Sequence, residues 1–136
     1  MDRIDIFIEV PSVKYEKLAA EVGQNQSQIF RQRIEKARNV QKERFTLLNS
    51  PRANFAEQNY LTGLTNSEMN IPEIKKYCYH DAQSQDLLKK YVDSGKLSAR
   101  GYHRVLKVAR TIADLAESEK IQQEHVAEAL MYRLRA

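Results

Sequence analysis

One segment near the N-terminus, residues 4–10, has the composition of a β-strand, and it constrains the fold more than any other feature. Branched and aromatic residues dominate it, polar Asp5 and Glu9 interrupt the apolar run, and Pro11 ends it. A single strand is not stable alone, because its backbone donors and acceptors need partners. No later part of the sequence has a convincing strand pattern. The sequence therefore predicts an all-α protein, a small helical bundle preceded by one orphan β-strand whose sheet lies in a neighbouring chain or in a missing part of the protein.

Helical patterns fill the chain after Pro11. Apolar periodicity and helix-ending residues predict helices over residues 13–22, 26–48, 72–77, 82–94, 99–117 and 123–133. Ser12, Asp81 and Ser98 are the expected N-caps, Pro72 is expected at a first helical position, and Gly23 and Gly95 are the expected stops. Residues 49–70 lack periodicity and are predicted to be a surface connection with one helical turn near residues 55–60. We therefore divide the chain into a terminal strand of a missing core (1–12), connecting helices (13–48), an irregular loop (49–70) and a helical bundle (71–136).

The periodicity also predicts which side chains face the core. The expected inward residues are Phe30, Ile34, Ala37, Gln41, Phe45 and Leu48; Ala82, Gln85, Leu88 and Val92; Tyr102, Val105, Leu106, Ala109, Ile112, Ala113 and Ala116; and Val126, Ala127 and Leu130. Short connections between the later helices favour a bundle of about four helices as the core.

Composition excludes several classes of protein. With 42% hydrophobic and 29% charged residues and few Gly or Pro, the 136-residue chain is expected to form one soluble, helix-rich domain. No apolar run approaches the roughly 20 residues that span a bilayer, so no membrane partner is expected and the predicted location is the cytoplasm. A single cysteine, Cys78, agrees with a reducing compartment. The histidines are too far apart for a helical metal site, so no metal ligand is assigned.

The sequence has no complete active site, but one position indicates anion binding. Its four glycines are isolated, so it contains neither a P-loop nor a dinucleotide fingerprint. If Ser98 caps a helix, Arg100 lies in the first turn, where the helix dipole disfavours a cation. An arginine is reasonable there if it and the free N–H groups bind one phosphate together. The alternative is a surface arginine whose side chain lies over the bundle.

The long predicted helix carries a local excess of positive charge. Its charged residues between positions 28 and 48 are Arg31, Arg33, Lys36, Arg38, Lys42 and Arg44 against Glu35 and Glu43. Such a helix can follow a phosphate backbone, with Arg31, Arg38 and Lys42 as candidate nucleic-acid contacts. It can equally be a solvated face stabilised by neighbouring carboxylates.

Four stretches of the chain resemble a known family. They are LSARGYHRVLKVARTIADL (97–115), IQQEHVAEALMYR (121–133), RIEKARNVQ (33–41) and DRIDI (2–6). Together they are similar to the C-terminal lid domain of magnesium-chelatase-like AAA+ ATPases, of the ComM/YifB type. The similarity is most specific in residues 97–115 and loose in residues 51–70.

The resemblance implies specific roles for two arginines. Arg100 matches the family's sensor-2 arginine, which reaches the γ-phosphate of ATP, and Arg3 is similar in context to an arginine finger presented to a neighbouring subunit. The implied cofactors are ATP and Mg in the parent protein. The implied partners are an N-terminal AAA+ core, neighbouring subunits of a homo-oligomeric ring, and the branched DNA that the competence branch of the family remodels. The family name gives no direct support for inserting magnesium into a porphyrin.

Two departures from the family pattern limit these expectations. The Walker A and Walker B segments are absent, so this chain alone is expected to bind ATP weakly and to hydrolyse none. Gly101 follows the sensor-2 position where the pattern has alanine, and a glycine there destabilises a helix by up to about 1 kcal/mol. The orphan strand is explained if the AAA+ core precedes this sequence.

Two other readings remain open. One is a standalone nucleic-acid-binding module built on the basic helix, although its only aromatic residues, Phe30 and Phe45, suit the core better than base stacking. The other is a helical adaptor that binds another protein through residues 49–70, which include Phe55, Tyr60 and two leucines.

Overall fold

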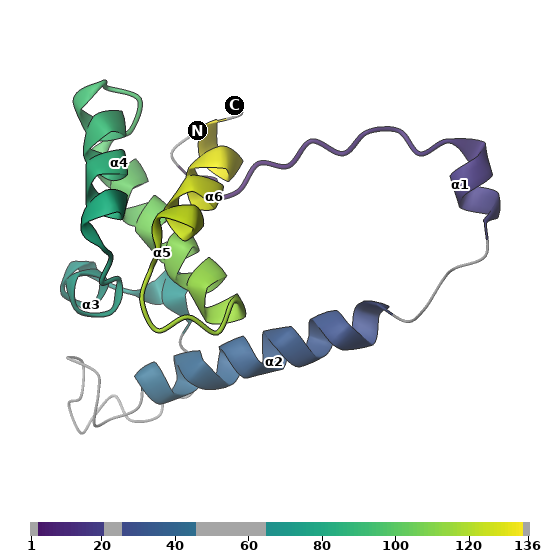
Figure 1. Cartoon of the computed structure of the whole chain (residues 1–136), viewed down its shortest axis with the longest axis horizontal. Helices are drawn as coiled ribbons and strands as arrows, with labels where there is room; N and C mark the ends of the chain where they lie inside the picture. Colours follow the sequence, from purple (N-terminus) through teal and green to yellow (C-terminus); the bar gives the residue numbers. More distant parts are fainter. Residues whose placement is uncertain (1–2, 21–25, 46–64, 135–136) are drawn as a thin grey trace.

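The computed structural model describes residues 3–20, 26–45 and 65–134, and the regular secondary structure within them is helical (Figure 1). The elements are α1 (Tyr15–Ala19), α2 (Gln26–Arg44), the 3-10 turn η3 (Asn66–Glu68), α3 (Ile71–Tyr77), α4 (Ala82–Asp93), α5 (Ala99–Leu115) and α6 (Gln123–Leu134). The described residues contain no sheet, so the predicted small helical bundle is confirmed. No helix in these ranges combines the length and the apolar character that crossing a membrane requires.

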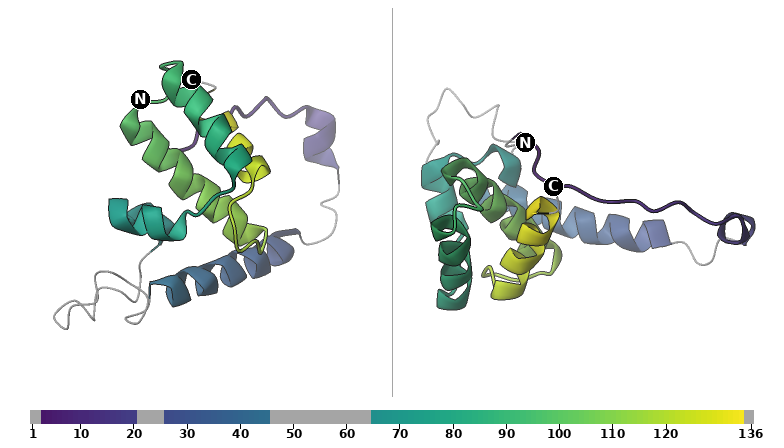
Figure 2. Two further views of the ribbon diagram at one scale, coloured as in Figure 1. Left: turned by 60° about the vertical axis from the view of Figure 1, so that its left-hand side comes forward. Right: turned by 90° about the horizontal axis from the view of Figure 1, so that it is seen from above.

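Helix α5 is the centre of the bundle. It contacts α2, η3, α3, α4 and α6, and the views in Figure 2 show these elements arranged around it. The core that these contacts bury comprises Phe45, Met69, Ile74, Cys78, Leu88, Leu97, Val105, Leu106, Ala109, Ala113, Ile121, Val126, Ala129 and Leu130. Because apolar burial is the main favourable term in folding, α5 is the element on which the stability of the bundle depends most.

Helix caps fix where the bundle helices begin. The side chain of Asp81 accepts a hydrogen bond from the Ser84 amide, and Ser98 accepts one from the Gly101 amide. Both caps are those that the sequence predicts. Gly95 follows α4 with φ of 73°, a left-handed conformation that glycine adopts without a steric penalty. Helix α3 begins one residue earlier than predicted, because Asn70 caps it and puts Pro72 at the second position.

The predicted strand is not formed. Residues 4–10 have no strand partner among the described residues, and Phe7 donates its amide to the Tyr132 carbonyl at 2.8 Å. The side chains of Ile4, Ile6 and Ile8 are 49%, 47% and 70% exposed. A strand needs a continuous ladder of backbone hydrogen bonds, and one bond to a helix end does not supply it.

The inner faces of three helices differ in part from the predicted stripes. In α4 the buried residues are Ser84 and Leu88, whereas Ala82, Gln85 and Val92 are exposed. The buried face of α4 is therefore rotated from the predicted one so that it includes Ser84. The few apolar residues of this short helix did not predict that orientation. In α5 and α6 most of the stripe is buried as predicted, but Ala116 is exposed beyond the helix end, Ala127 is half-buried, and Ala129 is buried in its place.

Helix α2 packs on the bundle only through its C-terminal half. Ala37, Gln41 and Phe45 are buried as predicted, whereas Phe30 and Ile34, on the same stripe, are each 52% exposed. Figure 1 shows the reason: the N-terminal half of α2 extends past α5 and has no described element beside it. The apolar stripe predicted for this half is present in the sequence, but no element in the described part of the chain packs against it.

The segments around α2 are shorter or more structured than predicted. Helix α1 is preceded by Lys14 rather than capped by Ser12, and none of its five residues is buried. Leu48 and the predicted turn at residues 55–60 lie outside the described residues. At the end of the predicted loop, η3 is an ordered turn that places Asn66 and Met69 in the protein interior, which a surface connection would not do.

Candidate functional site

The candidate site begins at the N-terminal end of α5. Ser98 caps the helix, and its hydroxyl accepts a 3.1 Å hydrogen bond from the Gly101 amide. Arg100 lies in the first turn and is exposed. Within the described residues its side chain makes no hydrogen bond or ion pair, so its guanidinium is available to a ligand or to another part of the protein.

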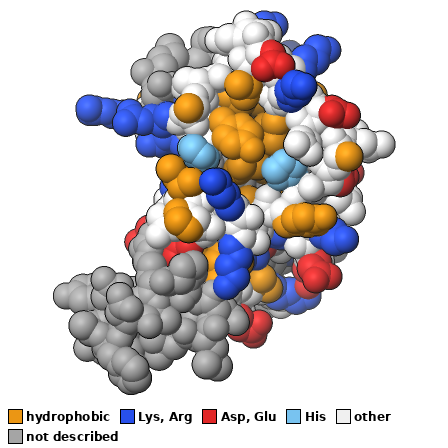
Figure 3. Space-filling view, turned by 90° about the vertical axis from the view of Figure 1, so that its left-hand side faces the viewer, with side chains coloured by type: hydrophobic (Ala, Val, Ile, Leu, Met, Phe, Trp, Pro, Cys, Tyr) orange, Lys and Arg blue, Asp and Glu red, His pale blue; other side chains and the backbone are white. Residues whose placement is uncertain are grey.

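Three further side chains on α5 share the face of Arg100. His103, Arg104 and Lys107 follow at spacings of three or four residues, which places them on one side of a helix. These four side chains line a cavity of about 950 Å³, whose other wall is formed by η3 and the start of α3. Figure 3 shows Lys and Arg side chains beside a hydrophobic hollow with a histidine on either side of it. Two of the chain's histidines, His80 and His103, line one 340 Å³ pocket next to the larger cavity.

The charges of the larger cavity favour an anion. Of the described residues that line it, three are cationic, and Asp5 is the one carboxylate. Asp5 is already paired with Arg104, so it does not oppose a negative ligand at full strength. Lys107 donates to the Ser67 carbonyl at 2.9 Å, which leaves Arg100 as the least committed of the three cations. Guanidinium groups match the planar, bidentate geometry of phosphate, so the arrangement suits a phosphate-bearing ligand.

Arg3 lies close to this face rather than apart from it. Its backbone carbonyl accepts a 3.2 Å hydrogen bond from Arg104 Nη1, and Arg3 itself is exposed. Arg104 is one helical turn, about 6 Å along the axis, from Arg100. The structure therefore brings the two arginines suggested by the sequence to the same end of the bundle.

The candidate nucleic-acid residues form a separate surface on α2. Arg31, Arg38 and Lys42 are exposed, and their spacings of seven and four residues place them on one side of the helix. Two other cations of the basic run have different roles. Lys36 pairs with Glu117 at 3.2 Å, and Arg44 is a member of a buried network.

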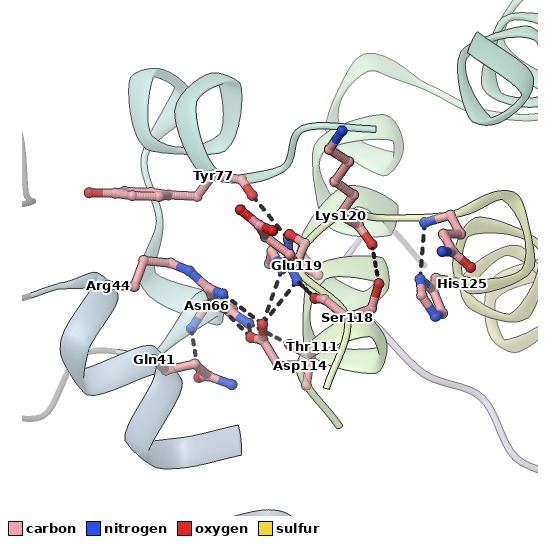
Figure 4. A network of polar contacts seen from close by, with 12 residues as sticks. Gln41, Arg44, Asn66, Tyr77, Thr111, Asp114, Ser118, Glu119, Lys120 and His125 are labelled. Atoms are coloured by element: carbon pink, nitrogen blue, oxygen red, sulfur yellow. Dashed lines mark hydrogen bonds and ion pairs between the residues drawn. The ribbon is translucent and has the colours of Figure 1, made fainter. Parts of the chain in front are cut away.

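That buried network was not foreseen from the sequence (Figure 4). Its centre is Asp114, whose carboxylate accepts from Arg44 at 2.6 and 2.8 Å, from Asn66 at 2.8 Å and from Arg110 Nε at 3.1 Å. Gln41 on α2 accepts the Asn66 amide at 3.2 Å. The network thus joins α2, η3 and α5 through hydrogen bonds that are buried or partly buried.

Arg110 shows how deeply the network is buried. Burial lowers the pKa of its guanidinium, and the neighbouring Asp114 carboxylate counteracts that shift. Arg110 also donates to the Ser118 and Glu119 carbonyls at 2.7 and 2.9 Å. Together with the bond from Nε to Asp114, these contacts give each nitrogen of the guanidinium group an acceptor. A signal was present in the sequence, since Arg110 and Asp114 are four residues apart beside the apolar stripe of α5.

Cys78 and His125 have side chains of types that are often catalytic, but both lie in the protein interior. Burial raises the pKa of the Cys78 thiol to about 12, so this cysteine stays protonated and is a weak nucleophile. His125 is buried, and its Nδ1 accepts the Gln122 amide at 3.0 Å at the start of α6.

Comparison with known proteins supports a relationship over almost the whole chain. Residues 24–133 match the family described as magnesium chelatase, subunit ChlI C-terminal. The chain is 36% identical over 135 residues to the competence protein ComM of Haemophilus influenzae and 32% identical over 134 residues to the uncharacterized protein YifB of Escherichia coli. Each alignment covers 98% of this chain but only 23% of the relative, so the chain spans about a quarter of the length of these relatives.

Proposed function

Because the chain belongs to the family of magnesium chelatase subunit ChlI C-terminal domains, we propose that it is the lid of an ATP-driven motor and contributes Arg100 to an ATP site. The match also confirms its resemblance to the C-terminal part of ComM/YifB-type proteins. One of these relatives is named a competence protein. We also propose that the longer protein containing this chain forms a ring-shaped oligomer that remodels DNA.

The observation that carries the proposal is the state of Arg100. It is exposed in the first turn of α5, lines a cavity with further cations, and has no partner among the described residues. An arginine that served only to stabilise the bundle would be expected to contact a carboxylate or a carbonyl, as Arg110 does. Arg100 is instead placed to bind a group that another part of the protein or a ligand brings to it.

The chemistry of this face fits the phosphates of ATP but not Mg²⁺. Mg²⁺ binds carboxylate oxygens and waters, and Asp5, the one carboxylate among the described lining residues, is paired with Arg104. In this proposal Mg²⁺ is bound by other parts of the longer protein. Arg100 binds the γ-phosphate and stabilises the negative charge that develops during phosphoryl transfer.

Residues 4–10 support the proposal that a separate core packs against this lid. Their apolar side chains Ile4, Ile6, Ile8 and Val10 all remain exposed, although Ile6 and Ile8 border a pocket of about 390 Å³ beside α5 and α6. Polar contacts of the Asp5 side chain and the Phe7 backbone amide hold the segment on the bundle. An extended segment with an exposed apolar side is suited to join a sheet. In the proposed assembly that sheet belongs to an N-terminal ATPase core, and Arg3 at the start of the segment reaches the ATP site of a neighbouring subunit.

Nucleotide discrimination tests the assignment of Arg100. In a longer protein that includes the ATPase core, Arg100→Ala should weaken ATP binding by about ten- to hundredfold while ADP binding changes little, because a charge-assisted contact worth roughly 1.5–3 kcal/mol is lost only at the γ-phosphate. The measurement is titration calorimetry with a slowly hydrolysed ATP analogue and with ADP. Lys89→Ala, which removes an exposed cation from α4, is the control. An unchanged ratio of the two affinities would reject the γ-phosphate role.

A second candidate function, DNA binding by α2, is favoured by a separate observation. Arg31, Arg38 and Lys42 lie on one exposed side of the helix and have no ion pair among the described residues. Positive side chains in such a row release counterions from a phosphate backbone when they bind it.

The salt dependence of DNA binding tests this second candidate. Changing Arg31, Arg38 and Lys42 together to glutamine should reduce the slope of log K against log salt by about 3, because each lost phosphate contact contributes roughly 0.9. The measurement is fluorescence anisotropy with duplex DNA over a series of salt concentrations. Changing Lys89, Lys90 and Lys96 to glutamine removes equal charge from another surface. If both triple variants lower the slope equally, binding depends on overall charge and α2 is not the site.

A further inference from the structure

Residues 3–7 are attached to the ends of α5 and α6 by a small set of polar contacts, which we call the Arg104 clamp. Arg104 pairs with the Asp5 carboxylate and donates to the Arg3 carbonyl at 3.2 Å. Arg133 donates to the Ile4 carbonyl at 3.0 Å, and the Phe7 amide donates to the Tyr132 carbonyl at 2.8 Å. These contacts join positions 99 to 129 residues apart in sequence.

Gly101 makes room for one member of the clamp. A Cβ atom at this position would lie 3.1 Å from Arg133 Nε and 3.0 Å from the Leu97 Cδ1 atom, both closer than side chains normally approach. The glycine therefore lets Arg133 of α6 lie directly against the first turn of α5. From the sequence alone this glycine was expected to loosen the turn, but the structure shows that it is buried and closely packed.

Arg104 links the two arginines of the proposed ATPase function. Its guanidinium contacts the backbone of Arg3, while its own backbone lies one turn after Arg100 on the same helix face. Asp5 opposes this guanidinium, and the ion pair is partly exposed, with side-chain exposures of 28% for Arg104 and 45% for Asp5. Movement of α5 must then carry Arg3 with it unless the clamp opens.

We infer that Arg104 is a positioning residue that fixes Arg3 relative to Arg100, so that the lid and the segment carrying Arg3 move as one unit. This inference rests on the proposed function, since it assigns the two arginines to ATP turnover. Arg104 acts through the Arg3 backbone and the Asp5 carboxylate, not through contact with the nucleotide. The clamp would transmit a displacement of the lid at Arg100 to the position of Arg3.

A double-mutant cycle separates positioning from direct contact. In the longer protein, Arg104→Ala should lower kcat by about tenfold with little change in KM, and the same substitution in an Arg3→Ala background should have no further effect. Arg104→Lys, which keeps the charge opposite Asp5, should restore part of kcat. If Arg104→Ala lowers kcat equally with and without Arg3, Arg104 binds the nucleotide or acts only on folding, and the positioning role is rejected.

Hydrogen exchange tests the clamp in the 136-residue chain, independently of any ATPase role. The Phe7 amide should exchange about three to ten times faster in Arg104→Ala and in Asp5→Asn, the range expected for losing a partly exposed ion pair. Lys107→Ala removes a cation one turn further along the same face, which bonds the Ser67 carbonyl instead, and should leave Phe7 unchanged. Equal exchange of Phe7 in all four proteins would overturn the clamp. If exchange responds while Arg100→Ala leaves ATP turnover unchanged, the clamp exists and the proposed function is what fails.

Discussion

Replacing Asp114 with alanine is expected to lower the free energy of unfolding by about 3–5 kcal/mol, a large part of the stability of a domain of this size. The substitution leaves Arg44 and Arg110 without the carboxylate that both of them contact, and the two side chains are only 10% and 3% exposed. Two like charges that are buried without a counter-ion repel each other and cannot regain their hydration. Contacts between α2 and the rest of the bundle should be lost first, because Arg44 of α2 contacts the Asp114 carboxylate directly.

Urea denaturation followed by circular dichroism measures this loss. Glu117→Ala is the matched control, because it removes a carboxylate from the same end of α5 whose ion pair with Lys36 is about two-thirds exposed on both sides. That change should cost less than about 1 kcal/mol. If Asp114→Ala and Glu117→Ala destabilise the chain equally, the buried network is not what joins α2 to the bundle.

Arg100→Ala is expected to reduce ATP turnover of the longer protein by about a hundredfold or more, the size of effect seen when one charge-stabilising donor is removed from a transition state. Its cause is the loss of a guanidinium at the γ-phosphate, not a loss of structure. Arg100 is exposed and has no partner among the described residues, so its removal should change the free energy of unfolding by less than about 0.5 kcal/mol. Turnover is measured by phosphate release at saturating ATP.

Comparison of Arg100→Ala with Arg100→Lys sharpens the interpretation. Lysine keeps the positive charge but lacks the bidentate geometry, so it should recover only part of the lost turnover. Lys89→Ala on α4 should leave turnover unchanged. If Arg100→Ala turns over ATP at the rate of the unmodified protein, Arg100 is a surface arginine, as the alternative reading of the sequence allowed.

Local signals in the sequence were sufficient to predict most of the bundle. Asp81 and Ser98 were identifiable as caps because short polar side chains bond to the free amides of a first turn. Gly95 was identifiable as a stop because glycine, which lacks a Cβ, is favoured in the left-handed conformation that often ends a helix. The structure gives Gly95 this conformation, with φ of 73°. These features depend on residues only a few positions apart, which a single sequence displays directly.

Features that depend on distant partners could not be predicted in the same way. The stripe of α2 is continuous in sequence, but only the tertiary structure shows that Ala37 is covered and Ile34 is not. Asn66 lay in a segment without periodicity, and its burial depends on a carboxylate 48 residues away. Residues 4–10 have the composition of a strand, but that pattern does not specify whether a sheet is present to receive them.

The candidate site was predictable only in part, for the same reason. The conflict between the charge of Arg100 and the helix dipole marked that residue from the sequence, and the family resemblance gave it a role. The cavity around it was not predictable, because η3 and the start of α3 form its other wall. The role of Arg104 could not be predicted from the sequence, because its partners, Asp5 and the Arg3 carbonyl, are about a hundred positions away.

The most direct test of the central claim is a structure of the longer protein with a slowly hydrolysed ATP analogue bound. We expect a guanidinium nitrogen of Arg100 to lie about 3 Å from an oxygen of the γ-phosphate, within hydrogen-bonding distance. A nucleotide bound in the ATPase core while Arg100 of every subunit points into solvent or pairs with a protein carboxylate would rule out the proposed role of Arg100.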